Sequence, residues 1–206
     1  MKRAFDLTVA FLALVITSPI VVAAAIGVKL ESPGPAFYSG PRVGLNGLPF
    51  RIHKLRTMRV GADGIGPAVT AAGDSRITSV GRLLRRTKAD ELPQLVNVLK
   101  GEMSLVGPRP EHPDYVKHYT TEQRLCLSVR PGMTGPTALA YIDEEQILGA
   151  GDAETTYLRE VMPRKLALDL DYVRTASFAG DLRILLKTAA LLLRRPFASS
   201  RPRRQP

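Results

Sequence analysis

Residues 7–28 form an uncharged, mostly apolar run of 22 residues, and this run constrains the fold more than any other feature of the chain. As an α-helix it would be about 33 Å long, because each residue adds about 1.5 Å. That length reaches across the roughly 30 Å hydrocarbon core of a bilayer. The run therefore predicts a targeting or membrane segment, for which three arrangements compete.

A cleaved secretory signal peptide is the first arrangement. Lys2 and Arg3 precede the apolar run, and the small residues at 23–25 resemble a cleavage site. Against this, Cys126 is the only cysteine, so no disulfide can form within the chain, and Pro19 breaks the apolar run in its middle. Export is therefore the least favoured of the three.

A straight spanning helix and a re-entrant helix are the other two arrangements. Because positive residues flank the run on both sides, spanning would leave one positive flank outside the cytoplasm, against the positive-inside tendency. A bend at Ser18 and Pro19 would return the chain to the membrane face from which it entered. Lys2, Arg3 and Lys29 would then lie together on the cytoplasmic side. Pro19 leaves one helix carbonyl without a donor, and the Ser18 hydroxyl can donate to such a carbonyl. The sequence therefore favours a re-entrant anchor kinked at these two residues.

Positive charge is concentrated at the two ends of the chain. The net charge is +10; residues 1–60 carry 8 basic and 2 acidic groups, and residues 183–206 carry 7 basic and no acidic groups. Anionic lipid attracts such segments by roughly 1 kcal/mol per Lys or Arg. Leucines and basic residues are interspersed over 182–195, as in an amphipathic interfacial helix, although a core helix with a solvated tail would also fit.

Nucleic acid is the other polyanion that a basic chain commonly binds. Trp is absent, aromatic residues make up 6% of the chain, and Phe and Tyr do not cluster with the arginines. Stacking platforms for bases are therefore not evident, and we expect no nucleic-acid partner.

The rest of the chain predicts an α/β fold of the helix-rich α+β kind, with a small sheet. We divide it into a membrane anchor at 1–31, one compact domain at 32–180, and an amphipathic helix with a basic tail at 181–206. Strands are expected at 36–43 and 49–58, joined by a turn at 44–47, with a loop at 61–73. Helices are expected at 77–87, 90–100, 113–127, 154–175 and 180–195.

An adjacent pair of carboxylates, Asp90 and Glu91, begins the second of these helices. Pro93 supports a helix start there and Gly101 a helix stop. The apolar face that would bury the helix and hold the pair rigid consists of Leu92, Leu95, Val96 and Leu99. Carboxylates are also common in the first turn of a helix because they interact favourably with the positive end of the helix dipole. The pair by itself therefore does not establish a site.

A constrained arginine follows that helix. Pro108 and Pro110 fix the backbone on either side of Arg109 and aim its guanidinium, which matches phosphate oxygens in a bidentate fork. Together with the basic residues at 85–88, the carboxylate pair and this arginine indicate phosphate chemistry assisted by a divalent cation.

Several motifs resemble, in order, those of the monotopic phosphoglycosyl transferases, the bacterial sugar transferases that act on polyprenyl phosphate. The resemblance covers nearly the whole chain. The matching segments are residues 2–6 with 18–19, 41–44, 54–58, 74–78, 81–85, 90–91 with 107–110, and 129–135. The chain lacks the multi-span N-terminal extension of larger members, so it resembles the minimal catalytic form.

The resemblance implies transfer of a sugar 1-phosphate from a UDP-sugar to a membrane polyprenyl phosphate, with release of UMP, as the first step of surface glycan assembly. Asp90 would be the nucleophile that carries the phosphosugar, and Glu91 would assist the polyprenyl phosphate as it attacks. Mg²⁺ would sit at Asp90 and the diphosphate. Arg109 and Arg85 would bind substrate phosphate, with Lys54 and Arg56 as further phosphate contacts.

The family's re-entrant helix agrees with the charge argument, and the resemblance implies that the domain lies on the cytoplasmic face of the bacterial inner membrane. Residues 136–145 depart from the family pattern, where many members have a tryptophan and a short polar run, so no particular donor sugar is implied. Whether the chain forms a homo-oligomer is left open. The alternative function is a membrane-tethered basic adaptor for nucleic acid or acidic partners, which would tolerate changes at Asp90 and Glu91.

Overall fold

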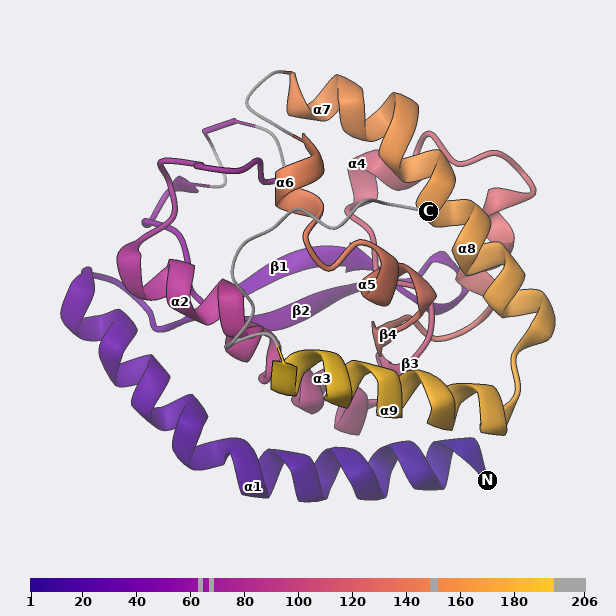
Figure 1. The fold of residues 1–206 in the computed structure, drawn as a ribbon, viewed down its shortest axis with the longest axis horizontal. Coiled ribbons are helices and arrows are strands. Elements are labelled where there is room, and N and C mark those ends of the chain that lie inside the picture. Colours follow the sequence, from indigo (N-terminus) through magenta and orange to yellow (C-terminus); the bar gives the residue numbers. More distant parts are fainter. Residues whose placement is uncertain (63–64, 67–68, 149–151, 195–206) are drawn as a thin grey trace.

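The computed structural model describes residues 1–62, 65–66, 69–148 and 152–194. A long N-terminal helix, α1 (Lys2–Glu31), runs along one edge of a helix-rich domain that contains two small sheets (Figure 1). The predicted helix-rich architecture with a small sheet is confirmed. The division of the chain at residues 31 and 180 stays a prediction.

Helix α1 is continuous but bends near its middle, where Pro19 lies (Figure 1). The Ser18 hydroxyl donates to the Val15 carbonyl at 2.8 Å, and this is the carbonyl that Pro19 leaves without a backbone donor. Among the described residues, α1 is the helix long and apolar enough to cross a membrane. Its large exposed apolar side chains are Phe11, Leu12, Val15, Ile16, Ile20, Val22, Ile26 and Leu30.

The predicted hairpin is present as the antiparallel strands β1 (Phe37–Val43) and β2 (Pro49–Leu55), which pair from Phe37 with Leu55 to Val43 with Pro49. The 3₁₀ turn Leu45–Gly47 joins them, with Asn46 and Gly47 at positive φ. Strand β2 ends at Leu55, not at residue 58 as predicted. After Leu55 the backbone turns to other partners, and the Thr57 carbonyl accepts from the N–H of Thr78.

A second, parallel pair of strands was not predicted. Strands β3 (Ser104–Val106) and β4 (Gly132–Thr134) have three residues each, too few for an alternating pattern to be recognised. Their pairing depends on glycine, because a Cβ on Gly132 would lie 2.1 Å from the backbone N of Gly107. A Cβ on Gly135 would lie 2.3 Å from the Gly107 carbonyl oxygen. The glycines of the motifs at 107–110 and 129–135 therefore let two backbones meet.

Most predicted helices are confirmed within one or two residues. The helix expected at 77–87 is α2 (Ser79–Thr87). The helix expected at 154–175 consists of three successive segments, which are α7 (Ala153–Thr156), a π-helical turn (Tyr157–Val161) and α8 (Met162–Thr175). The last is α9 (Phe178–Arg194), beyond which the predicted basic tail lies outside the described residues. The remaining helices are α3 (Gln94–Lys100), α4 (Pro113–Val116), α5 (Pro136–Ala140) and α6 (Glu144–Leu148).

The prediction of one continuous helix at 113–127 is wrong in the middle of that range. Helix α4 ends at Val116, and a separate 3₁₀ segment covers Gln123–Ser128. Thr120 and Gln123 bond reciprocally, since the Thr120 N–H donates to Oε1 of Gln123 and the Gln123 N–H donates to the Thr120 hydroxyl. Such side-chain bonds compete with the helical ladder and begin a new segment. Cys126 is buried there.

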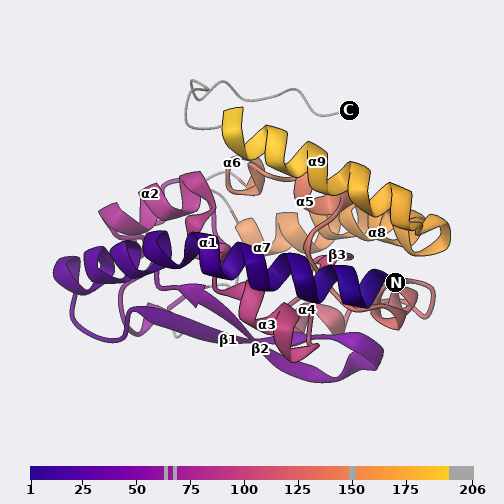
Figure 2. The same ribbon diagram turned by 90° about the horizontal axis from the view of Figure 1, so that it is seen from below.

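Helix α1 packs against the domain through both of its halves. Ala10 in the first half joins a buried cluster with residues of α3, β3 and α8 that includes Val98, Met103 and Tyr172. Val28 in the second half packs with Leu55 and Leu84. Helix α9 lies beside the first half of α1 (Figure 2). The apolar helix is therefore part of the domain's packing along its length.

Gly81→Ala should destabilise the fold although alanine favours helices. Gly81 lies inside α2, and a Cβ there would be 2.0 Å from the Thr57 carbonyl oxygen, so the helix must move away from the backbone it packs on. We expect a loss of about 1–3 kcal/mol. Gly27→Ala in α1 is the matched control, because its nearest neighbour would be Val80 at 3.7 Å. Thermal unfolding in lipid nanodiscs should separate the two, and an unchanged midpoint for Gly81→Ala would contradict the close packing.

Candidate active site

The carboxylate pair lies at a corner between two helices. After α2 ends at Thr87, Lys88 adopts a left-handed conformation with φ of 60°, and a 3₁₀ turn (Ala89–Glu91) precedes α3. Asp90 and Glu91 therefore belong to this turn and not, as predicted, to the helix that follows. Gly101 ends α3 in a left-handed conformation, as predicted.

The buried face of α3 differs from the predicted one. It consists of Gln94, Leu95, Asn97 and Val98, while Leu92, Val96 and Leu99 are half-buried. Asn97 is the reason, because its carboxamide donates to the Arg51 carbonyl at 2.8 Å and accepts from the His53 N–H at 3.0 Å. These bonds tie α3 to strand β2. The prediction weighed only apolar spacing and missed this polar anchor.

Two cations hold Glu91. Nζ of Lys54 lies 3.1 Å from Oε1 of Glu91, and Nη2 of Arg109 lies 2.6 Å from the same oxygen. Nη1 of Arg109 is 3.4 Å from Oε2, so the guanidinium faces both carboxylate oxygens. Although burial acts in the opposite direction, the charges of Arg109 and Lys54 hold the pKa of Glu91 well below its ordinary value. Glu91 is therefore ionised at neutral pH.

Asp90 has a different environment. It is 6% exposed, and its Oδ1 is buried without a hydrogen-bond partner among the described residues. Burial raises the pKa of Asp90, an effect that Glu91 reinforces and Lys54 opposes. Burial also lowers the pKa of Lys54. Two adjacent carboxylates whose pKa values are pushed apart are typical of a site that assigns them different chemical roles.

The unpredicted strand pair positions Arg109. The loop at 107–110 follows β3 directly, and the N–H of Gly107 donates to the Thr134 carbonyl at 3.0 Å. The Pro108 carbonyl accepts from the N–H of Gly132 at 2.8 Å. Strand β4 thus holds the loop on both sides of Pro108, and the guanidinium of Arg109 reaches Glu91 from a rigid backbone.

Arg85 lies near the pair without contacting it directly. Its Nε and Nη2 contact Oε1 of Glu145 at 2.8 and 2.7 Å, and its Nη1 contacts the Thr57 hydroxyl at 3.3 Å. Its positive charge acts to lower the pKa of Asp90. The carboxylate of Glu145, on α6, therefore contacts the edge of the Arg85 guanidinium with which Arg85 would bind a phosphate.

Arg56 lies elsewhere, at the C-terminal end of α1. The guanidinium donates to the carbonyls of Ser32 at 2.8 Å and Val28 at 3.5 Å, and also to the Pro33 carbonyl. Arg56 is only 6% exposed. Carbonyls at the end of α1 accept from its Nη1 and Nη2, so Arg56 has a structural role at this helix end, and its contact with phosphate stays a prediction.

A divalent cation fits Asp90 on chemical grounds. Among the residues that the structure describes, no three His, Cys, Asp or Glu side chains gather as a metal-binding group. Mg²⁺ needs no such group, since it is commonly bound by one or two carboxylates together with substrate phosphates. The free Oδ1 of Asp90 is a suitable carboxylate ligand.

Comparison with known proteins identifies the family. The model of the bacterial sugar transferase family matches residues 1–195. The UDP-glucose:undecaprenyl-phosphate glucose-1-phosphate transferase of Caulobacter vibrioides is 45% identical over 196 residues, which are 93% of this chain and 69% of that protein. An uncharacterized sugar transferase of Bacillus subtilis is 39% identical over 94% of this chain and 87% of its own length.

A third relative names a different sugar. The UDP-N-acetylgalactosamine-undecaprenyl-phosphate N-acetylgalactosaminephosphotransferase of Aeromonas hydrophila is 36% identical over 93% of this chain, which spans only 43% of that protein. The names of the Caulobacter and Aeromonas relatives therefore share undecaprenyl phosphate and differ in the sugar. On the match over residues 1–195 and on these identities, the chain belongs to the bacterial sugar transferase family.

Proposed function

We propose that this protein transfers a sugar 1-phosphate from a UDP-sugar to a membrane polyprenyl phosphate, releasing UMP and beginning the assembly of a surface glycan. The observation that carries the proposal is the unequal carboxylate pair. Asp90 is buried with an unpaired oxygen, and beside it Glu91 is held ionised by Lys54 and Arg109. The chain's membership of the bacterial sugar transferase family supports the same reaction.

In the first step a carboxylate oxygen of Asp90 attacks the sugar-bearing phosphorus of the donor. The bond from that phosphorus to the bridging oxygen breaks, UMP leaves, and an aspartyl-phosphosugar remains. The attack uses the ionised form of the Asp90 carboxylate, which is weakly held because its Oδ1 has no hydrogen-bond partner among the described residues. When bound, Mg²⁺ held by Asp90 and the diphosphate would supply charge neutralisation between two anions.

In the second step an oxygen of the polyprenyl phosphate attacks the same phosphorus, and the bond to Asp90 breaks. The product is a polyprenyl diphosphate sugar, and the Asp90 carboxylate is restored. Glu91 assists this attack at the acceptor phosphate. Arg109 and Lys54, which both contact Glu91, would bind the phosphates of either substrate, and Arg85 would be a further phosphate contact.

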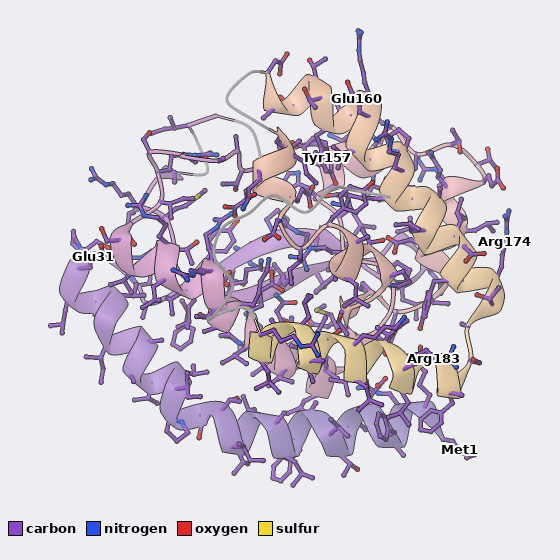
Figure 3. All side chains as sticks on the ribbon, viewed as in Figure 1. Met1, Glu31, Tyr157, Glu160, Arg174 and Arg183 are labelled. Carbon is purple, nitrogen blue, oxygen red and sulfur yellow. The ribbon has the colours of Figure 1, made fainter. Side chains whose placement is uncertain are left out.

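Contacts at both ends of α1 support a re-entrant anchor. At its start, Lys2 pairs with Asp181 of α9 at 2.5 Å, and Arg3 donates to the Val98 carbonyl at 2.7 Å. At its end, Arg56 holds the carbonyls of the last turn, and Glu31 accepts from the N–H groups of α2. Figure 3 shows Met1 and Glu31 at the two ends of α1, both beside the domain.

Two helix ends bound to one domain lie on one side of a membrane. We therefore propose that α1 dips into one leaflet, with its exposed apolar residues in lipid, and that the domain rests on the cytoplasmic face. Helix α9 would lie at the interface, because Leu182, Leu186 and Leu193 are exposed among basic residues.

The test is UMP release by the purified full chain in lipid nanodiscs, with polyprenyl phosphate, Mg²⁺ and a panel of UDP-hexoses and their N-acetylated forms. We expect release with one or a few donors and loss of release when EDTA removes the metal, with recovery on adding Mg²⁺ back. When polyprenyl phosphate is left out, UMP release that stops after a single turnover would mark the covalent step. If no donor gives UMP, the transferase proposal fails, and the adaptor alternative becomes the better one.

A further inference from the structure

Arg85 is a proposed phosphate contact whose binding edge is already occupied by another side chain. Arg85 lies on α2 and Glu145 on α6, two helices that are labelled in Figure 1. Nε and Nη2 of Arg85 both contact Oε1 of Glu145, at 2.8 and 2.7 Å. These two nitrogens form an edge of the guanidinium that matches a phosphate in a bidentate fork. A phosphate and Glu145 therefore cannot use this edge of Arg85 at the same time.

Thr57 holds the Arg85 guanidinium independently of Glu145. Nη1 of Arg85 donates to the Thr57 hydroxyl at 3.3 Å. Thr57 is buried, and its carbonyl accepts from the N–H of Thr78 at 3.0 Å, so its own position is fixed by the backbone that precedes α2. Because Thr57 contacts Nη1 and Glu145 contacts the opposite edge, the guanidinium would keep its direction if Glu145 turned away.

The two glutamates that begin α6 have contacts of different strength. Nζ of Lys165 donates to both carboxylate oxygens of Glu144 at 3.0 Å and to the Tyr157 hydroxyl at 3.1 Å. The Lys165 side chain is 9% exposed, so this pair fastens α6 to α8 largely out of solvent. The side chains of Arg85 and Glu145 are 22% and 41% exposed, and water can replace such an ion pair at little cost. Glu145 can therefore leave Arg85 while Glu144 keeps α6 in place.

We propose that Glu145 is a displaceable anion, which occupies the phosphate-binding edge of Arg85 in the empty site and is released when the diphosphate of the donor binds there. The inference rests on the proposed function for the role of Arg85 and for the class of donor. A diphosphate carries more negative charge than one carboxylate, so it can take the place of Glu145 on the guanidinium. Glu145 thereby lowers the affinity of the site for any anion that must compete with it.

Modification of arginine by phenylglyoxal gives a readout that needs neither activity nor substrate. An ion pair with a carboxylate protects a guanidinium from this reagent. In the full chain in lipid nanodiscs, we expect Glu145→Gln to raise the rate of modification at Arg85 about three- to tenfold, measured by mass spectrometry of the peptides. Glu122→Gln is the matched control, because Oε1 of Glu122 pairs with Nη2 of Arg174 at 2.5 Å. It should increase modification of Arg174 and leave that of Arg85 unchanged.

The affinity for UDP in the presence of Mg²⁺ measures the competition directly. By calorimetry in nanodiscs, Glu145→Gln should bind UDP about three- to tenfold more tightly than the native chain, because no side chain has to be displaced. Glu145→Ala should change the affinity in the same direction. In an Arg85→Gln background, Glu145→Gln should change the affinity less than about twofold, since the guanidinium for which the two anions compete is gone. Equal gains in both backgrounds would overturn the inference, because Glu145 would then act only as a nearby negative charge.

Inorganic pyrophosphate separates a failure of this inference from a failure of the proposed function. We expect it to protect Arg85 from phenylglyoxal at a lower concentration in Glu145→Gln than in the native chain. If UDP binds neither chain while pyrophosphate still shows this difference, the sugar nucleotide donor is wrong and the displaceable Glu145 stands.

Three results would overturn the displacement itself. The first is an unchanged rate of modification at Arg85 in Glu145→Gln, and the second is the absence of protection by pyrophosphate in both chains. The third is weaker binding of UDP by Glu145→Gln, which would mean that Glu145 holds Arg85 in the position that the donor needs.

Discussion

Asp90→Asn should abolish UMP release and at the same time make the folded protein more stable at neutral pH. The rate should fall on the order of 10⁴-fold or more, because the nucleophile is lost and an amide cannot form the phosphosugar intermediate. The carboxylate is 6% exposed and its Oδ1 has no partner among the described residues, so folding strips its charge of water, and the charge of Lys54 offsets only part of that penalty. A neutral amide of the same shape escapes most of that penalty.

The gain in stability should depend on pH in a defined direction. Burial raises the pKa of Asp90 in the folded state, so at a pH below the ordinary value of about 3.9 the group is neutral in both states and imposes no penalty. As the pH rises through the raised folded pKa, the native protein loses stability that the asparagine variant keeps. Thermal unfolding in nanodiscs between pH 4.5 and 7.5 should show a widening gap, at about 2–4 °C per 1 kcal/mol.

Glu91→Gln is the matched comparison, and its effect on stability should have the opposite sign. The charges of Arg109 and Lys54 hold the pKa of Glu91 below its ordinary value despite burial, so the ionised group stabilises the fold at neutral pH. That stability is present above about pH 4.3, the unfolded value, and is lost as the pH falls through the folded pKa. Equal stability changes in the two variants would contradict the unequal environments of the pair.

Local rules predicted much of this fold. The apolar run, the proline inside it, the Asn-Gly turn and the glycine that ends α3 each act over a few residues, and each is found in the structure. Residue chemistry grouped Arg109 with the carboxylate pair in one candidate site, and in the structure Arg109 contacts Glu91.

Long-range polar contacts could not be predicted in the same way. Three-residue strands carry too little pattern to be recognised, so the β3–β4 pair that fixes the arginine loop was missed. The contacts of Arg56 with the end of α1 were also missed, because only the folded chain brings those carbonyl acceptors to its guanidinium. Asn97 likewise acts through partners 44 and 46 residues away along the chain. A spacing rule cannot reveal such contacts.

Cysteine labelling should place both ends of α1 on the cytoplasmic side of the membrane. The native thiol, Cys126, is buried, and burial raises its pKa to about 12, so it should give almost no background with a maleimide. Three single substitutions report on the start of α1, its middle and the domain that follows it. They are Ala4→Cys near the start of α1, Ile16→Cys near its middle and Leu48→Cys in the domain, all at exposed positions.

With a membrane-impermeant maleimide, Ala4→Cys and Leu48→Cys should label in inside-out vesicles and not in spheroplasts. Ile16→Cys should label in neither preparation until detergent is added. Ile16 is 74% exposed in the protein alone, so its protection would have to come from lipid, because protein packing does not cover it. Labelling of Ala4→Cys in spheroplasts would mean that α1 spans the bilayer, and the contacts of Lys2 with Asp181 and of Arg3 with the Val98 carbonyl could not then form in the membrane. The labelling pattern therefore tests the contacts at the start of α1 together with the topology that they imply.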